Sequence, residues 1–320
     1  MDASQIQPHA ARLFRGQHVR RTRVAVEHEL LVSDAAGRTV PVETLRGLAT
    51  GDYRSHLTFE PGGQVELSLP CASSPAAVAA RLAGEVTALT EDLGRAGIRL
   101  LDLPLDVRPE SQVPLRLRTS RYVAMQRHFD TVGPAGRRMM RRTASTQVCL
   151  DWWSGPVGLE QWRVLNLAAP FLAAAFARTA PAGRLATWLE VDPARTGFDD
   201  RLLAGPDPVT AYAAFAAGAK VFTAPGDAEA HLSTLFPPVR PRGTYLEARF
   251  LDVQPLAQVE HVTTVLASLL YDDERRRTWL GRLAGSQPHL ASLWHAAAAG
   301  DAEVIGVGRE IARTQSRVAA

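Results

Sequence analysis

Acidic side chains spaced two residues apart are the feature of this sequence most capable of chemistry. Glu27 and Glu29 flank His28, and Glu66 follows a turn that begins at Glu60. Residues two apart on a β-strand point to the same face of the sheet. Two carboxylates side by side on a buried face repel each other unless a cation lies between them, so the spacing indicates a cation site. For an E-x-E pattern taken alone, a solvated strand edge is the alternative.

The turn lies in the run E-P-G-G-Q-V-E-L-S at residues 60–68, which predicts two strands joined by a bend. Glu66 and Ser68 would share one face of the second strand. Gly62 and Gly63 would let the backbone approach a ligand closely, because glycine has no side chain in the way.

Two further segments place polar side chains at the same spacing. Gln147 and Cys149 would share one strand face, and so would Glu247 and Arg249. Mg²⁺ prefers hard oxygen ligands, and arginine neutralises a phosphoryl group during its transfer. A sheet face lined with carboxylates, amides and arginines therefore indicates a metal-dependent phosphoryl-transfer site.

Lysine is nearly absent, since Lys220 is the only one in 320 residues. No G-x-x-x-x-G-K-[ST] motif occurs, so a bound nucleotide would have to be held by arginines and metal ions. The net charge of +3 comes with no basic run interleaved with aromatic residues, and we expect no nucleic-acid partner.

The composition is that of an ordinary globular chain, with 46% hydrophobic and 22% charged residues. The N-terminus has no basic stretch followed by an apolar run, and no apolar stretch is long enough for a bilayer. We expect a cytoplasmic protein with no membrane partner. The two cysteines, Cys71 and Cys149, form no C-x-x-C pair, and we expect neither to be a nucleophile or a metal ligand.

Hydrophobic periodicity and turn residues predict an α+β fold with a mixed or antiparallel sheet, because the strands are separated by long and irregular connections. No convincing linker divides the chain, so we expect one catalytic domain over residues 1–320. Strands are predicted over 22–32, 57–69, 98–103, 144–151, 188–191 and 244–251. Helices are predicted over 2–17, 74–96, 119–131, 134–141, 159–178, 208–217 and from about 256 onward.

These segments resemble the glutamate–cysteine ligase family, in its plant and actinobacterial branch. Residues 60–68 are close to the family signature E-P-G-G-x-x-E-L-S, and residues 121–125 are similar to its R-Y-x-x-M helix. Residues 139–151 resemble its M-M-x-x-T-x-x-x-Q-V-N-L-D strand, and residues 231–252 are very similar to the enzymes that feed ergothioneine biosynthesis. The motifs fall in family order over roughly residues 20–275.

The resemblance implies a glutamine-synthetase-like active-site sheet flanked by helices. It also implies an ATP-driven reaction with Mg²⁺, in which the γ-carboxylate of L-glutamate becomes an acyl phosphate. The amine of L-cysteine then attacks, giving γ-glutamylcysteine, ADP and phosphate.

The resemblance also implies roles for individual residues. Arg249 would stabilise the transferring phosphate, with Glu247 beside it, and the candidate Mg²⁺ ligands are Glu27, Glu29, Glu60, Glu66 and Glu247. The candidate substrate- and nucleotide-binding residues are Arg195, Arg142, Gln147, Gly62 and Gly63.

The sequence departs from the family pattern on the substrate side. Cys149 replaces an asparagine, residues 181–188 are short and are expected to lack the family's Trp- and Arg-bearing loop, and residues 220–231 are also shortened. A ligase of the same chemistry acting on another amine or acid is therefore an alternative. A catalytically weak relative that binds nucleotide is a second alternative. The intact carboxylates argue against it, because an inactive site would be free to lose them.

Overall fold

The protein folds around one antiparallel sheet with helices on either side. The computed structural model describes residues 1–179, 183–224 and 226–313. The strands pair in the order β2-β3-β1-β5-β7-β6, β4 also pairs with β1, and every pairing is antiparallel. Their bounds are β1 (Val24–Ser33), β2 (Leu57–Phe59), β3 (Val65–Ser68), β4 (Arg99–Leu101), β5 (Thr146–Asp151), β6 (Val239–Pro241) and β7 (Tyr245–Ala248). The predicted α+β class with an antiparallel sheet is confirmed.

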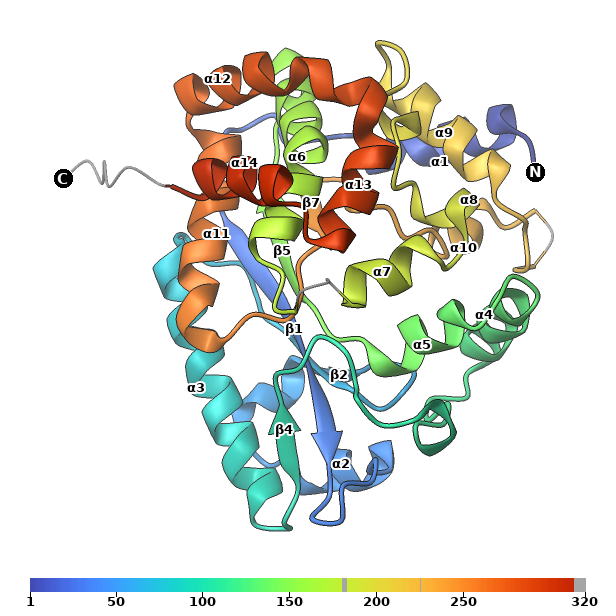
Figure 1. Cartoon of the computed structure of the whole chain (residues 1–320), viewed down its shortest axis with the longest axis vertical. Coiled ribbons are helices and arrows are strands. Elements are labelled where there is room, and N and C mark those ends of the chain that lie inside the picture. The colour runs from blue at the N-terminus through green and yellow to red at the C-terminus, as the bar shows by residue number, and fades with distance from the viewer. Residues whose placement is uncertain (180–182, 225, 314–320) are drawn as a thin grey trace.

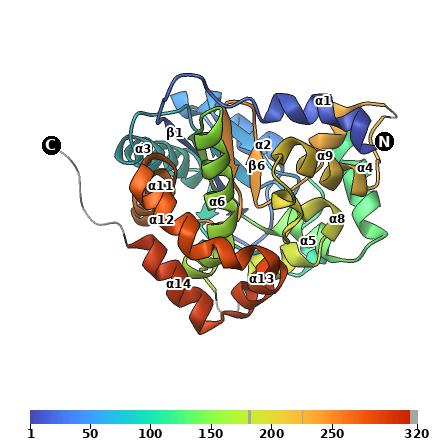
Figure 2. The same cartoon turned by 90° about the horizontal axis from the view of Figure 1, so that it is seen from above.

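The helices are arranged around this sheet (Figures 1 and 2). In chain order they are α1 (Ala3–Leu13), α2 (Val42–Leu48), α3 (Pro75–Gly94), α4 (Ser120–Asp130), α5 (Ala135–Arg142), α6 (Pro156–Ala175) and α7 (Gly183–Leu189). They continue with α8 (Pro193–Thr196), α9 (Pro208–Gly218), α10 (Ala228–Leu232), α11 (Leu256–Tyr271), α12 (Asp273–Leu283), α13 (Leu290–Ala299) and α14 (Ala302–Ala312).

The helices divide into two groups about α6. In both views α3 and α11 lie side by side, with α4 and α5 on the other side of α6. One hydrophobic core runs from Ile6 to Ile311 and includes α3, α6 and α11. A smaller cluster, which includes Met125, Phe129 and Met140, lies between α4 and α5. The α4 and α5 group therefore has an apolar cluster of its own.

Two helices begin and bend where their residues predict. Ser74 caps α3 by accepting a hydrogen bond from the backbone N–H of Ala77, and Pro75 occupies the first turn. The α6 helix contains Pro170, as expected, and begins at Pro156.

The predicted strand over residues 188–191 is wrong. Trp188 belongs to α7, and the chain after it leads into α8, which Asp192 caps through the backbone N–H of Ala194. A short apolar run fits a strand or a buried helical turn equally well, so periodicity could not decide between them. Burial of Arg184 and Leu185 on the inner side of α7 favours the helix.

Candidate functional site

A cavity of about 340 Å³ lies over one face of the sheet. The residues predicted for the site that line it are Glu27, Glu29, Glu60, Glu66, Gln147, Glu247 and Arg249. They come from β1, β3, β5, β7 and the turn between β2 and β3. The structure thus brings together all five glutamates that the sequence proposed as metal ligands.

The central strand β1 positions the first pair of carboxylates. Glu27 and Glu29 face the cavity, while His28 points to the opposite face and lies 3.0 Å from the hydroxyl of Thr146 through Nδ1. Glu29 is only 8% exposed and accepts a hydrogen bond from the backbone N–H of Ser145 at 2.8 Å. Its carboxylate is therefore held in one orientation before any ligand binds.

Three carboxylates form the tightest group in the cavity. One oxygen each of Glu29, Glu60 and Glu66 lies within 4.8 Å of the others. The hydroxyls of Thr58 and Ser68 donate to Oε1 of Glu66 at 2.7 and 2.9 Å and fix its side chain. We call Glu29, Glu60 and Glu66 the carboxylate triad. Its donor set of hard oxygens is the kind that Mg²⁺ prefers.

Burial and mutual repulsion change the acidity of these groups. Burial, followed by the charge of Glu66, raises the pKa of Glu27 and of Glu29 to about 7. The same causes raise the pKa of Glu60 well above its usual range. Like charges held this close are unfavourable without a counter-ion, and a divalent cation would relieve both the desolvation and the repulsion. The residues present therefore fit a bound Mg²⁺.

Gln147 on β5 connects the acidic side of the cavity to its arginine. Its side-chain amide donates to Oε1 of Glu29 at 2.9 Å, and its carbonyl oxygen accepts from Nη1 of Arg249 at 2.6 Å. Cys149, two residues further along β5, is buried, and burial raises the pKa of its thiol well above its usual range. A thiol of this kind is a poor nucleophile and a poor metal ligand.

Arg249 follows β7 and forms an ion pair with Glu247. Arg242 approaches the other carboxylate oxygen of Glu247 at 3.8 Å. Burial lowers the pKa of Arg249 to about 10, so its guanidinium stays charged at neutral pH. Its Nε has no hydrogen-bond partner among the described residues. An arginine with an unused donor at the edge of the carboxylates can donate a hydrogen bond to a phosphoryl oxygen.

Gly62 and Gly63 were expected to let the backbone of the turn approach a ligand, and in the structure they have a different role. A Cβ on Gly62 would lie 2.2 Å from the backbone oxygen of Arg141, and Gly63 has a φ of +90° with Arg116 against it. The residues of this turn that line the cavity are Glu60, Pro61 and Gln64. Gly62 and Gly63 therefore allow the turn to pack against the C-terminal end of α5, and they do not line the cavity.

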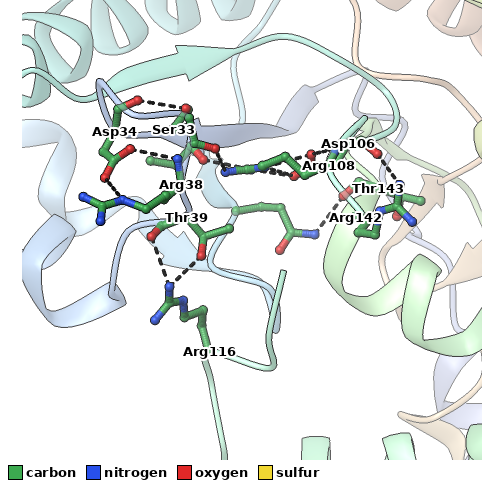
Figure 3. A network of polar contacts seen from close by, with 12 residues as sticks. Ser33, Asp34, Arg38, Thr39, Asp106, Arg108, Arg116, Arg142 and Thr143 are labelled. Atoms are coloured by element: carbon green, nitrogen blue, oxygen red, sulfur yellow. Dashed lines mark hydrogen bonds and ion pairs between the residues drawn. The ribbon is translucent and has the colours of Figure 1, made fainter. Parts of the chain in front are cut away.

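Two of the arginines proposed for substrate also lie outside the cavity. Arg195 is fully buried and bonded to Asp192 at 3.2 Å and to the hydroxyl of Thr234 at 2.7 Å. Arg142 donates to the backbone oxygen of Asp106 at 2.6 Å (Figure 3). The guanidinium of Arg195 is therefore occupied by partners from the fold. Arg142 keeps its Nε without a partner among the described residues, but it does not line the cavity.

The structure supplies an arginine that sequence reasoning missed. Arg184 and Trp188 lie one turn apart on α7 and line the cavity, so this stretch still places an arginine and a tryptophan at the site. The expected absence of the family's loop stays a prediction. Arg184 is 4% exposed, donates to the backbone oxygen of Arg249 at 3.1 Å and leaves its Nε without a described partner. The signal was the i, i+4 spacing of the two residues, which becomes informative only once the segment is a helix. Residues 180–182, just before it, lie outside the described residues.

Apolar side chains from outside the sheet form a second part of the cavity lining, which we call the apolar wall. It consists of Tyr122 and Met125 of α4, Met139 and Met140 of α5, and Phe236. Tyr122 and Met125 belong to the R-Y-x-x-M motif, and Met139 and Met140 form the M-M motif, so both motifs reach the cavity. Such a wall excludes water, which strengthens the charge interactions on the sheet side.

Comparison with known proteins identifies the family to which the chain is similar. The model of glutamate-cysteine ligase family 2 matches residues 23–300. The glutamate–cysteine ligase EgtA of Mycolicibacterium smegmatis is 34% identical over 68% of this chain and 60% of its own length. The enzyme of the same name from Mycobacterium tuberculosis is 30% identical over 72% of this chain and 62% of its own length. The chain thus spans about 60% of the length of the curated relatives it matches.

Among solved structures, a bifunctional glutathione synthetase from Pasteurella multocida covers 97% of this chain with 49% of its own, at 13% identity and a TM-score of 0.46. This score is too low to support a shared fold by itself. In the part of the chain that the structure describes, no helix is long and apolar enough to cross a membrane.

Proposed function

The chain belongs to glutamate-cysteine ligase family 2, and we propose that it joins the γ-carboxylate of L-glutamate to the amine of L-cysteine at the expense of ATP. The products are γ-glutamylcysteine, ADP and phosphate. The observation that carries the proposal is the placement of the carboxylate triad and Arg249 around one cavity, connected through Gln147.

The carboxylate triad would hold Mg²⁺, with Glu27 beside it. When bound, the ion supplies charge neutralisation for the phosphate oxygens. The triad itself is prepared for this, because Ser145 and Gln147 orient Glu29, and Thr58 and Ser68 orient Glu66.

Glu247 has a different task from the triad. It is paired with Arg249 and approached by Arg242, so we assign it to the orientation of the arginines. Arg249 then donates to the phosphoryl group as negative charge builds up on it during transfer to the glutamate γ-carboxylate. Gln147 fixes the same guanidinium from the neighbouring strand.

Arg184 is the best placed group for the carboxylate of the acid substrate. It is a buried cation on the cavity wall, and no carboxylate of the described residues lies within ion-pair distance of it. Arginine pairs bidentately with carboxylates. We assign to Arg184 the role that the sequence suggested for Arg195 and Arg142, since neither of those two lines the cavity.

Amine attack needs a site next to the acyl phosphate from which water is kept out. The apolar wall of Tyr122, Met125, Met139, Met140 and Phe236 borders that position. Cysteine is the amine we propose, because residues 231–252 are so similar to the ergothioneine-pathway enzymes. We also propose that the protein works in the cytoplasm.

The test is ADP release by the purified protein with Mg²⁺-ATP and glutamate, while the amine is varied. Glutamate and cysteine together should give ADP and γ-glutamylcysteine in equal amounts. If another amine stimulates ADP release and cysteine does not, the ligase chemistry stands and the proposed amine is wrong. Release that depends on neither glutamate nor any amine would contradict the ligase assignment.

A further inference from the structure

Charge is divided across the floor of the cavity. The strand order puts β3 and β1 on one side of β5, and β7 and β6 on the other. Glu66 and Glu29 belong to the first side, whereas Arg240 in β6 and Arg249 after β7 belong to the second. Arg240 is directly opposite Glu247 in the register of these two strands. The cavity therefore has an acidic half and a basic half.

Arg240 in the basic half is a cation without a carboxylate partner. Its one hydrogen bond runs from Nη2 to the backbone oxygen of Ser233 at 3.2 Å, and no carboxylate of the described residues lies within 4.0 Å of its nitrogens. Burial lowers the pKa of Arg240. Arginine side chains remain protonated in proteins. A guanidinium carries five N–H donors, so most of those of Arg240 remain available to a ligand.

The guanidinium of Arg121 shares a hydrogen-bond acceptor with that of Arg240. Arg121, at the start of α4, donates from Nη2 to the same oxygen of Ser233 at 2.7 Å. Arg121 is exposed, lines the cavity and likewise has no carboxylate partner among the described residues. Two cations that share one neutral acceptor repel each other, and an anion between them would remove that repulsion.

We propose that Arg121 and Arg240 form the binding site for the non-transferred phosphates of the nucleotide, with Arg242 beside them. The proposal rests on the ATP-dependent function proposed above. It also specifies the orientation of the bound nucleotide. The triphosphate would run from the carboxylate triad and Arg249 toward the edge of the sheet at β6.

Charge favours a phosphate over an amino-acid carboxylate at this site. Among the described residues, Glu247 has the one carboxylate within 4.0 Å of a nitrogen of Arg121, Arg240 or Arg242, and it is already shared with Arg249. A substrate carboxylate carries one negative charge, whereas the two phosphates left on ADP carry more. Exposure of Arg121 also leaves an open path for the nucleoside, which has to extend beyond the phosphates.

The test is calorimetric binding of Mg²⁺-ADP in the absence of glutamate and amine. Arg240→Gln and Arg121→Gln should each weaken binding by roughly 10- to 100-fold, since each removes a charged hydrogen bond to phosphate. Adenosine, which has no phosphate, should bind the variants and the wild type equally. The KM for glutamate should be unchanged in both variants. Arg127→Gln is the matched control, because Arg127 is exposed on the same helix and does not line the cavity.

Arg240→Lys keeps the positive charge and should recover part of the lost affinity. If the Arg240→Gln variant, at a half-buried position, does not fold, the exposed Arg121→Gln variant carries the test. Unchanged Mg²⁺-ADP binding in Arg121→Gln would overturn the proposal, and so would a raised KM for glutamate or the amine with ADP binding intact. A wild-type protein that binds no Mg²⁺-ADP would overturn the ATP-dependent function as well, which separates the two failures.

Discussion

Arg249 donates a hydrogen bond from Nη1 to Oε1 of Gln147 at 2.6 Å, across the neighbouring strands β7 and β5. The amide of Gln147 in turn donates to Glu29 at 2.9 Å. One neutral side chain therefore separates the arginine from the carboxylates. Without Gln147, the guanidinium of Arg249 would be free to form an ion pair with Glu29 and to take the place of a bound cation.

The carboxylate triad predicts a specific effect of Glu66→Gln. The variant should lose ligase activity by about 100-fold or more, because changing even an indirect partner of a metal costs 10- to 100-fold. In the absence of Mg²⁺ its melting temperature should exceed that of the wild type, since one of three clustered charges is gone. Thermal melts with and without Mg²⁺ measure this, with Glu91→Gln on the exposed side of α3 as the control. A variant destabilised without metal would show that the three charges are not in conflict.

Arg249→Ala should remove turnover while leaving most of the nucleotide affinity. Arginines that stabilise charge during phosphoryl transfer are worth about 10³- to 10⁵-fold in rate. The measurement is kcat for ADP release beside the Kd for Mg²⁺-ADP. Near-normal turnover would show that Arg249 serves only to pair with Glu247.

Neither cysteine should be needed for activity. Burial raises the pKa of Cys149, and Cys71 is exposed and does not line the cavity. The double variant Cys71→Ser and Cys149→Ser should fold and keep its ligase activity. Complete loss of ADP release in a folded double variant would refute this expectation.

Arg195 should matter for stability and not for substrate affinity. Its guanidinium is fully buried against Asp192 and Thr234, and its Nε lies 3.2 Å from Nε2 of His128. Removing one partner of a buried pair costs about 3–5 kcal/mol. Urea unfolding of Arg195→Ala should show a loss of this size. A folded variant with wild-type stability and a greatly raised KM for glutamate would return Arg195 to the substrate site.

Asp92 should contribute stability that depends on pH. The hydroxyl of Tyr53 and the backbone N–H of Thr50 donate to its carboxylate and lower its pKa below the usual value. A depressed pKa in the folded protein stabilises it above the pKa of the unfolded chain, about 3.9, and this contribution is lost as the pH falls below it. Asp92→Asn should therefore be less stable than the wild type at pH 7.

Urea unfolding of the wild type and Asp92→Asn across this pH range measures the effect. The difference in free energy of unfolding should narrow as the pH falls below about 4. A difference that stays constant from pH 7 to pH 3 would show that the charge of Asp92 is not the source of its contribution.

Local patterns in the sequence identified the elements that do not depend on distant contacts. The period-two spacing of Glu27 and Glu29 placed both on one face of β1, and Ser74 with Pro75 marked the start of α3. The same reasoning was wrong for residues 188–191, since the burial of Arg184 and Leu185 favours a helix there. Local spacing carries no information about such burial.

The sequence by itself determined which side chains could do the chemistry, because strand periodicity puts Glu27 with Glu29 and Glu247 with Arg249 on common faces. Only the tertiary structure decided which arginines remain available to a ligand. Arg195 is neutralised by Asp192, while no carboxylate of the described residues lies within ion-pair distance of Arg184 or Arg240. An arginine has the same charge wherever it stands in a sequence, and its role depends on which partners the fold brings within a few ångströms.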